Sequence, residues 1–130
     1  MLIGGLAKAT GTKINTIRFY EEIGIMPEAA RTAAGQRTYE DRDIERLSFI
    51  RRARKLGFSI GEARSLLELK NEPDGECQKA ADIAYRHLHS VDERLAELTA
   101  LREELLQITE PCRGGSVSDC VIIEKLSRHR

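Results

Sequence analysis

The chain contains three cysteines, and their spacing could support soft-metal chemistry. Cys77 stands alone, whereas Cys112 and Cys120 lie at the two ends of a short glycine-containing segment. An odd number of thiols argues against a disulfide framework and leaves metal binding or redox sensing as the two interpretations. Thiolates are the ligands that soft metal ions prefer. The question is therefore which part of the chain could bring these three side chains together.

Residues 77–109 separate Cys77 from the other two thiols, and they are predicted to form one long helix. Apolar residues recur there at steps of three and four, which is the pattern of a helix-packing seam. The seam consists of Ala84, Leu88, Val91, Leu95, Leu98, Leu101, Leu105 and Ile108. A helix rises 1.5 Å per residue, so Cys77 and Cys112 are roughly 50 Å apart within one chain. A single chain cannot bring these two thiols to one ion.

A second copy of the helix would change this. If two helices pair antiparallel about a two-fold axis near Leu95, Cys77 of one chain falls beside Cys112 and Cys120 of the other. Two equivalent three-thiol clusters then form across the interface of a homodimer. The seam alone also fits a plain dimerisation helix in which the cysteines have no role.

Residues 1–70 are predicted to form a small helical domain. A short helix over 3–8 ends at Gly11, where a tight turn favours a positive φ, and a second helix follows over 13–23. Two helices joined by a glycine turn are typical of the helix-turn-helix motif of DNA-binding proteins. Two short strands around 33–36 would form a hairpin wing whose arginines could hold phosphates.

Local signals place the ends and faces of these elements. Thr12 is expected to cap the second helix, and Ile14, Ile17 and Tyr20 are spaced for its inner face. A third helix begins at Glu40, and Ser59 is expected to cap a fourth. The predicted parts are a winged-helix domain at 1–70, a turn at 71–76, the long helix at 77–109, and a metal-binding loop with a short helix at 110–130.

The charges are divided unevenly although the whole chain is formally neutral. Residues 1–70 carry 13 Lys and Arg against 9 Asp and Glu, whereas residues 71–130 carry 8 against 12. A basic first half suits an anionic partner such as DNA. No signal peptide or membrane span is expected, which predicts a cytoplasmic protein with reduced thiols. No paired acid and base, phosphate loop or cofactor motif indicates an enzyme.

Four stretches carry a family resemblance. They are Ile3-Gly4-Gly5-Leu6-Ala7, Thr16-Ile17-Arg18-Phe19-Tyr20-Glu21 followed by Gly24, Arg37-Thr38-Tyr39, and Arg51 and Arg54 with Leu56-Gly57-Phe58-Ser59. These motifs, and the likeness over nearly the whole chain, resemble the MerR family of transcription regulators. The three cysteines resemble the metal-responsive branch of that family.

The resemblance implies a mainly α fold, with a winged helix-turn-helix domain, a long antiparallel dimerisation helix and a short C-terminal metal-binding loop and helix. It also implies a homodimer that binds a palindromic promoter, represses without metal, and activates RNA polymerase by distorting the DNA when metal binds. The metal ligands would be Cys77, Cys112 and Cys120. The DNA contacts would come from Lys13, Asn15, Thr16, Arg18, Tyr20, Arg31, Arg37 and Tyr39.

The resemblance also bears on which metal is bound. A cysteine at the start of the long helix goes with divalent ions, and three thiolates suit Hg²⁺, Pb²⁺ or Cd²⁺, whereas Zn²⁺ favours a fourth ligand. Asp119 is interpreted as solvated, and His87, His89 and His129 as surface or interface residues. The seven-residue loop between Cys112 and Cys120 has the length of copper-type sensors. A copper, silver or gold sensor, a thiol redox sensor and a metal-sequestering coiled coil therefore stay open as alternatives.

Overall fold

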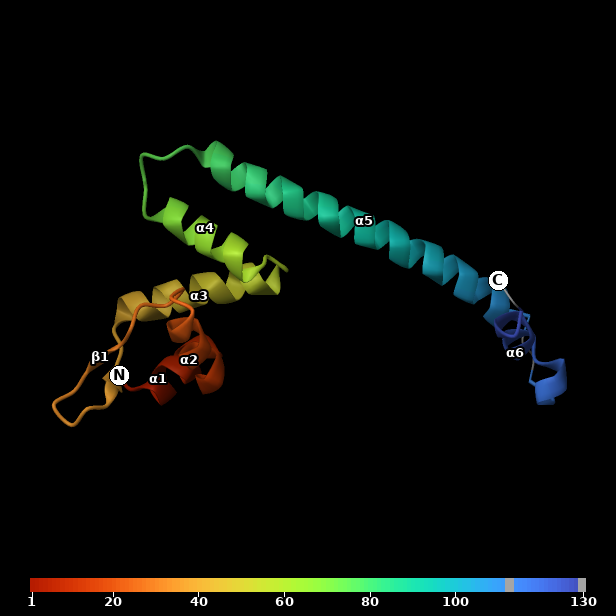
Figure 1. Cartoon of the computed structure of the whole chain (residues 1–130), viewed down its shortest axis with the longest axis horizontal. Helices are drawn as coiled ribbons and strands as arrows, with labels where there is room; N and C mark the ends of the chain where they lie inside the picture. The colour runs from red at the N-terminus through yellow and green to blue at the C-terminus, as the bar shows by residue number, and fades with distance from the viewer. Residues whose placement is uncertain (112–113, 129–130) are drawn as a thin grey trace. The chain divides into compact units, whose positions relative to one another are not determined.

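The computed structural model describes residues 1–111 and 114–128 of the chain, and this part is mainly helical (Figure 1). Its backbone contacts divide it into two compact units, Met1–Ala84 and Tyr85–Arg130. Each unit is described by itself below.

The first unit begins with the predicted helix-turn-helix motif. Helix α1 spans Ile3–Thr10 and helix α2 spans Ile14–Glu22. Gly11 joins them with a φ of 66°, and its N–H donates to the carbonyl of Ala7 at the end of α1. The expectation that Thr12 caps α2 is wrong. Lys13 occupies the N-cap position and makes no side-chain capping bond, while the Thr12 hydroxyl lies 3.0 Å from that of Thr10.

The wing follows α2 as a two-stranded antiparallel hairpin. Strand β1 spans Ala30–Arg31 and strand β2 spans Arg37–Thr38. Ala30 pairs with Thr38, and Arg31 pairs with Arg37. The strands flank the turn that the sequence predicted, and Gly35 supplies a positive φ of 84° within it.

Two further helices complete the core. Helix α3 spans Asp41–Lys55 and helix α4 spans Ile60–Lys70. Ser59 caps α4 as expected: its hydroxyl accepts from the N–H of Glu62 at 3.0 Å, and the Glu62 carboxylate accepts from the Ser59 N–H at 2.8 Å. This reciprocal pair satisfies two backbone donors that a helix start otherwise leaves free.

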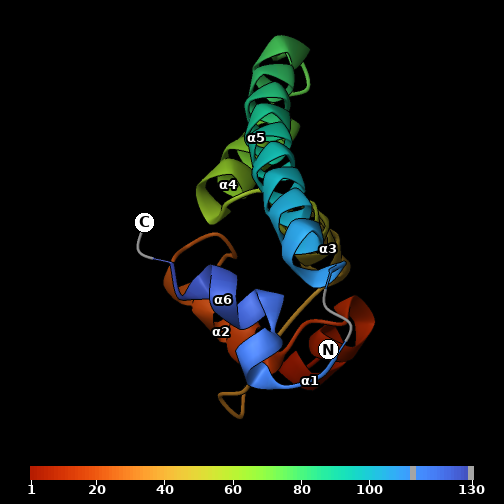
Figure 2. The same cartoon turned by 90° about the vertical axis from the view of Figure 1, so that its right-hand side faces the viewer.

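The core lies where α3 packs against both α1 and α4 (Figures 1 and 2). Its largest fully buried side chains come from α1, α2, the loop after α2, and α3, and they are Leu6, Ile17, Ile25, Met26, Leu47 and Ile50. Helix α4 adds Ala63, which is also fully buried. Tyr20 is buried, as its spacing predicted. Ile14 departs from the prediction and is 37% exposed, because it is the first residue of α2 and lies beyond the packed turns.

Three arginines of α3 and α4 donate to carbonyl oxygens at, or shortly after, the ends of the first two helices. Arg51 donates to Thr10, Arg64 donates to Ile23, and Arg46 donates to Ile25 at 2.7 Å. The carbonyl end of a helix carries partial negative charge and lacks backbone donors, so a guanidinium stabilises it. Arg46 and Arg51 both lie on α3, and both have this structural role.

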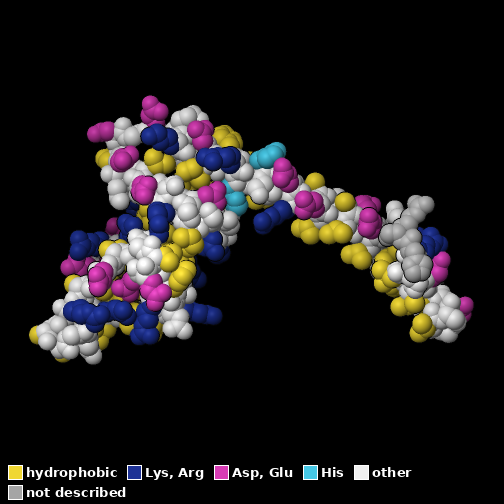
Figure 3. Space-filling view, in the orientation of Figure 1, with side chains coloured by type: hydrophobic (Ala, Val, Ile, Leu, Met, Phe, Trp, Pro, Cys, Tyr) yellow, Lys and Arg dark blue, Asp and Glu magenta, His cyan; other side chains and the backbone are white. Residues whose placement is uncertain are grey.

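The long helix α5 spans Cys77–Thr109, the bounds expected from the sequence, and it contains no buried residue. The first compact unit reaches past the turn at 71–76 into α5, because Cys77 and Ala80 border a depression with Leu66 and Leu69 of α4. Beyond Ala84, the leucines of the seam are more than half exposed, and Figure 3 shows apolar side chains gathered along one edge of the helix.

A short 3-10 turn, η1 (Val117–Asp119), and helix α6 (Val121–Leu126) follow, and α6 is the short helix that was expected within residues 110–130. Leu126 and Lys125 of α6 border a depression with Leu101, Leu105 and Ile108 of α5. Among the described residues, no helix has both the length and the apolar character that a membrane span requires.

Candidate nucleic-acid interface and metal centre

Three arginines converge on one surface depression between α2 and the wing. Arg18 comes from α2, while Arg31 and Arg37 come from the two strands, and the depression has a volume of about 260 Å³. The strand register places Arg31 directly opposite Arg37. Like charges that face each other across a hairpin are unfavourable unless an anion lies between them. The arrangement can therefore hold an anionic group such as a phosphate.

The geometry of the wing orients one of these guanidinium groups. Arg31 Nη1 donates to the carbonyl of Gly35 across the hairpin turn at 2.8 Å. A guanidinium has five N–H donors, so this bond leaves others available for phosphate oxygens. Arg37 is half-buried, whereas Arg18 and Arg31 are exposed. Helix α2 and the wing therefore present positive charge and N–H donors on the same surface.

The exposed face of α2 carries residues that could reach base edges. Asn15, Arg18, Phe19 and Glu22 follow the i, i+3, i+4, i+7 spacing of one helix face, and all are exposed. Lys13 is exposed at the N-cap and Thr16 is half-buried. Phe19 is 50% exposed and was not among the predicted contacts. The sequence could have identified Phe19, because this aromatic residue is next to Arg18 and lies outside the apolar face of the helix.

The two tyrosines among the predicted contacts are buried. Tyr20 is 8% exposed and Tyr39 is 3% exposed, and both belong to the core. The Tyr39 hydroxyl donates to Glu21 Oε1 at 2.9 Å. Burial, followed by this bond to a carboxylate, raises the pKa of Tyr39 to about 12. The structure thus places these rings in the packing of the domain, and a DNA contact by either tyrosine stays a prediction.

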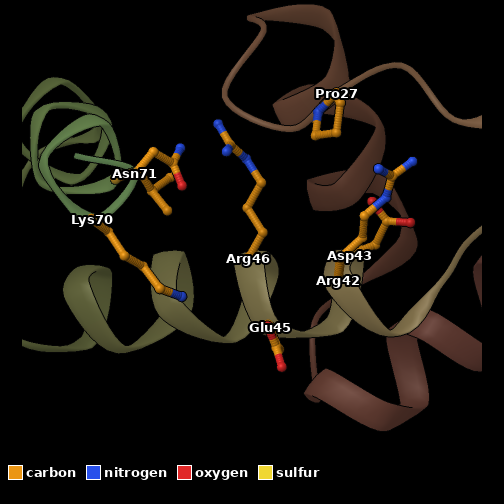
Figure 4. Close-up of a pocket in the computed structure, with 8 residues that line it drawn as sticks. Pro27, Arg42, Asp43, Glu45, Arg46, Lys70 and Asn71 are labelled. Carbon is orange, nitrogen blue, oxygen red and sulfur yellow. The ribbon is translucent and has the colours of Figure 1, made fainter. Parts of the chain in front are cut away.

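A second depression, lined by residues of α3 and α4, has mixed charge. Figure 4 shows Arg46 extending from α3 between Asn71, at the end of α4, and the loop that contains Pro27. Asp43 also lines this depression. Arg46 donates to the carbonyl of Ile25, and this bond ties α3 to the loop that follows α2.

The predicted metal ligands are described in part. Cys77 is exposed at the start of α5, Cys120 is half-buried immediately before α6, and Cys112, like His129, lies outside the described residues. Within the described residues of the single chain, no three His, Cys, Asp or Glu side chains are grouped closely enough to hold an ion. His89 pairs with Glu93 on α5 at 2.9 Å.

The surroundings of Cys77 suit a soft ligand. Its thiol borders a largely apolar depression with Phe49, Leu66, Leu69 and Pro73. Apolar surroundings favour thiolate coordination of a thiophilic ion over binding of a strongly hydrated cation. The donor type at Cys77 and Cys120 therefore fits a soft metal, provided that further ligands reach each thiol.

The helix-turn-helix motif, the arginine-bearing wing and the long helix together define a winged-helix DNA-binding protein. Comparisons with known proteins agree with this class. The chain matches the family model "MerR HTH family regulatory protein" over residues 1–70 and the model "MerR, DNA binding" over residues 44–108.

Individual relatives match over nearly the full length. The HTH-type transcriptional regulator HmrR of Rhizobium leguminosarum bv. viciae is 40% identical, with 98% of each chain covered. The lead(II) complex of the transcription regulator PbrR691 from Ralstonia metallidurans CH34 has a TM-score of 0.84 at 34% identity, covering 98% of this chain and 99% of that one. The mercury(II) complex of MerR from Bacillus megaterium MB1 has a TM-score of 0.70 at 27% identity, covering 98% and 100%.

These matches show that the chain belongs to the MerR family of transcription regulators. Members of this family are DNA-binding regulators and not enzymes. The family resemblance and the fold predicted from the sequence are thereby confirmed.

Proposed function

We propose that the protein is a metal-responsive transcription regulator that binds a palindromic promoter as a homodimer. It represses transcription without metal. When a soft divalent ion (Hg²⁺, Cd²⁺, Pb²⁺ or Zn²⁺) binds thiolates at the dimer interface, the regulator activates RNA polymerase by distorting the DNA. The observation that carries the DNA-binding part is the convergence of Arg18, Arg31 and Arg37 on one depression between α2 and the wing.

In this proposal the two elements have different roles. The exposed side chains of α2, with Lys13, Asn15, Thr16 and Arg18 among them, enter the major groove and contact base edges. Arg31 and Arg37 of the wing contact the adjacent phosphates, which fixes the register of the protein on the duplex. Exposed cations on both elements support this division.

The metal-binding part rests on the thiols and on the relatives. PbrR691 and the Bacillus megaterium MerR have been solved with lead(II) and mercury(II). Cys77 is the first residue of α5 and Cys120 follows the helix, so the 33-residue length of α5 keeps the two thiols from meeting in one chain. Cys77 of one protomer would therefore act with Cys112 and Cys120 of its partner. A bound soft ion would supply the cross-link between protomers, and the apolar side chains beside Cys77 would keep water away from it.

The DNA-binding part is tested by selecting duplexes from a random pool with the full chain and then measuring the affinity of variants. Arg18→Ala and Arg37→Ala should each weaken binding at least about tenfold, because each removes a charge-assisted contact. Arg102→Ala is the matched control, since it removes the same charge from the exposed surface of α5. Equal binding by all four proteins would contradict the proposal.

The cross-chain site is tested with mixed dimers under reducing conditions. Cys77→Ser and Cys120→Ser homodimers should bind no stoichiometric Hg²⁺, Cd²⁺, Pb²⁺ or Zn²⁺. A dimer of one Cys77→Ser chain and one Cys120→Ser chain should bind one ion, because both substitutions then fall in the same cluster and the other cluster stays complete. A mixed dimer that binds no ion would argue against ligands from two chains.

The same metal panel separates the alternatives. Induction by Cu⁺, Ag⁺ or Au⁺ and not by the divalent ions would indicate a monovalent sensor, in accordance with the seven-residue loop between Cys112 and Cys120. Induction by an oxidant with no metal present would indicate a redox sensor acting through a disulfide. Metal binding that is unaffected by Arg18→Ala, in a protein that selects no DNA, would indicate a sequestering coiled coil.

A further inference from the structure

One carboxylate on α2 accepts a hydrogen bond from the residue before the wing and another from the residue after it. Glu21 Oε1 accepts from the Tyr39 hydroxyl at 2.9 Å, and Glu21 Oε2 accepts from the backbone N–H of Ala29 at 3.3 Å. Ala29 immediately precedes β1, and Tyr39 immediately follows β2. The two oxygens of one side chain therefore bind the two chain segments that connect the hairpin to the core.

We propose that Glu21 is a positioning residue that fixes the wing relative to α2, so that the phosphate-binding arginines keep a set position beside the base-reading helix. This inference rests on the proposed DNA binding. It assigns to an acidic residue a favourable role in binding an acidic polymer, a role opposite to that expected from its charge.

The geometry explains why a carboxylate is needed at this position. The hairpin has two residues in each strand and is too short to hold its own orientation. An ionised carboxylate has two acceptor oxygens and no donor, which matches the hydroxyl on one side and the N–H on the other. Glu21 is also half-buried, so these bonds are formed in surroundings less polar than water.

The contact at Tyr39 is anchored in the core. Its ring is buried, and its backbone N–H donates to the carbonyl of Met1 at 2.7 Å. The packing of Tyr39 therefore restrains the segment after β2, and the hydrogen bond from its hydroxyl links that segment to α2. The raised pKa of Tyr39, about 12, keeps the hydroxyl protonated, and thus a donor, throughout the neutral range.

Glu22, next in sequence, provides a matched control for the exchange measurement. It has the same charge and lies on the same helix, but it is exposed, whereas Glu21 is half-buried. Removing either acid lowers the negative charge beside the DNA, which by itself should strengthen binding. Loss of the contacts to the wing should weaken it. The loss of charge and the loss of positioning therefore predict opposite changes in the DNA affinity of Glu21→Ala.

The first experiment measures hydrogen exchange in the free full-length chain and needs no DNA. Glu21→Ala should accelerate exchange at Ala29 and through both strands of the wing, while the amides of α1 and α3 keep their protection. Tyr39→Phe should accelerate exchange at β2 and leave the Ala29 amide less affected. Glu22→Ala should match the wild type. Unchanged wing exchange in Glu21→Ala would overturn the proposal.

The second experiment measures affinity for a duplex selected by the wild-type protein. Glu21→Ala should bind about tenfold more weakly than the wild type, as expected when charge-assisted hydrogen bonds are lost. Glu45→Ala removes the same charge from the exposed surface of α3, outside the proposed DNA contacts, and it should bind equally or more tightly. Equal or tighter binding by Glu21→Ala, despite faster wing exchange, would also overturn the positioning role. If the wild type selects no DNA, the proposed function fails, and exchange alone still decides whether Glu21 holds the wing.

Discussion

At the level of single residues, two groups of arginines in the first unit differ in what they contact. Arg46, Arg51 and Arg64 donate to carbonyl oxygens of the protein, whereas Arg18, Arg31 and Arg37 line the depression between α2 and the wing. The net charge of residues 1–70 does not distinguish the two groups. Because the first group is engaged within the protein, the count of cations overestimates the charge that is offered to DNA.

This division predicts the salt dependence of DNA binding. Arg37→Ala should reduce the slope of log affinity against log salt by about one, because one phosphate contact and its released counterion are lost. Arg64→Ala should leave the slope unchanged at temperatures where the variant is folded. Binding isotherms between low and moderate salt concentration measure both slopes. An equal change in the two slopes would contradict the assignment.

The buried tyrosine gives a pH prediction. The pKa of Tyr39 in the folded chain is about 12, above the ordinary value of 10. The folded state therefore holds the phenolic proton more tightly than the unfolded state. The stabilisation is complete below pH 10 and is lost as the pH rises through 12.

The measurement compares the wild type with Tyr39→Phe by chemical denaturation between pH 8 and 12. Lysines and the other tyrosines titrate in both proteins, so their effects largely cancel in the difference. The difference in unfolding free energy should be constant up to about pH 10 and should then shrink by up to about 2 kcal/mol. A difference that does not change with pH would show that the hydroxyl has the same surroundings in both states.

At the level of elements, the sequence predicted helices and turns better than side-chain environments. Glycine at a positive φ and the Ser59 capping pair gave local signals that needed no tertiary information. Tyr39 differed because its hydroxyl partner lies 18 residues earlier. The sequence alone does not reveal that partner, so a tyrosine close to arginines was predicted to be an exposed hydrogen-bond donor to DNA. The three arginines that bond to helix ends were hidden for the same reason.

The turn between α1 and α2 gives a stability prediction. A Cβ built at Gly11 would clash with Arg51 Nη1, and the φ of this residue is 66°. Gly11→Ala should therefore destabilise the chain by about 2 kcal/mol, from backbone strain and from disturbance of the Arg51 bond to Thr10.

Gly4→Ala is the control for this change. Gly4 lies inside α1, and a Cβ there would meet nothing within 4 Å. It should be neutral or should stabilise the chain by up to about 1 kcal/mol, because alanine favours helix. Thermal or denaturant unfolding of the two variants measures the contrast. A Gly11→Ala variant as stable as Gly4→Ala would refute the predicted close approach.

At the level of the whole molecule, the exposed seam of α5 predicts self-association. Leu98 is 62% exposed within the single chain. Leu98→Glu would place a charge in the proposed interface, and burying an unpaired charge is costly. It should shift the protein from dimer to monomer in sedimentation experiments. Ala96→Glu, one residue before Glu97 and outside the seam, should stay dimeric. A dimeric Leu98→Glu would locate the interface elsewhere.

The metal centre shows the limit of prediction from one chain. The length of α5 could be read from its period and its flanking turn, and this length separates Cys77 from Cys120. Which ion is bound depends on the distances between side chains of two protomers. Neither the spacing of the cysteines nor the described part of a single chain fixes those distances.

The absence of any buried residue along α5 has a consequence for how the regulator is made. A chain leaving the ribosome can complete the core of its first unit alone. If α5 pairs with a second chain as proposed, the leucines of its seam stay uncovered until that chain arrives. If the thiol cluster is shared as proposed, the fraction of working sensors follows mass action in protein abundance. The ion concentration that triggers a response then depends on the rate of synthesis of the regulator as well as on thiol chemistry.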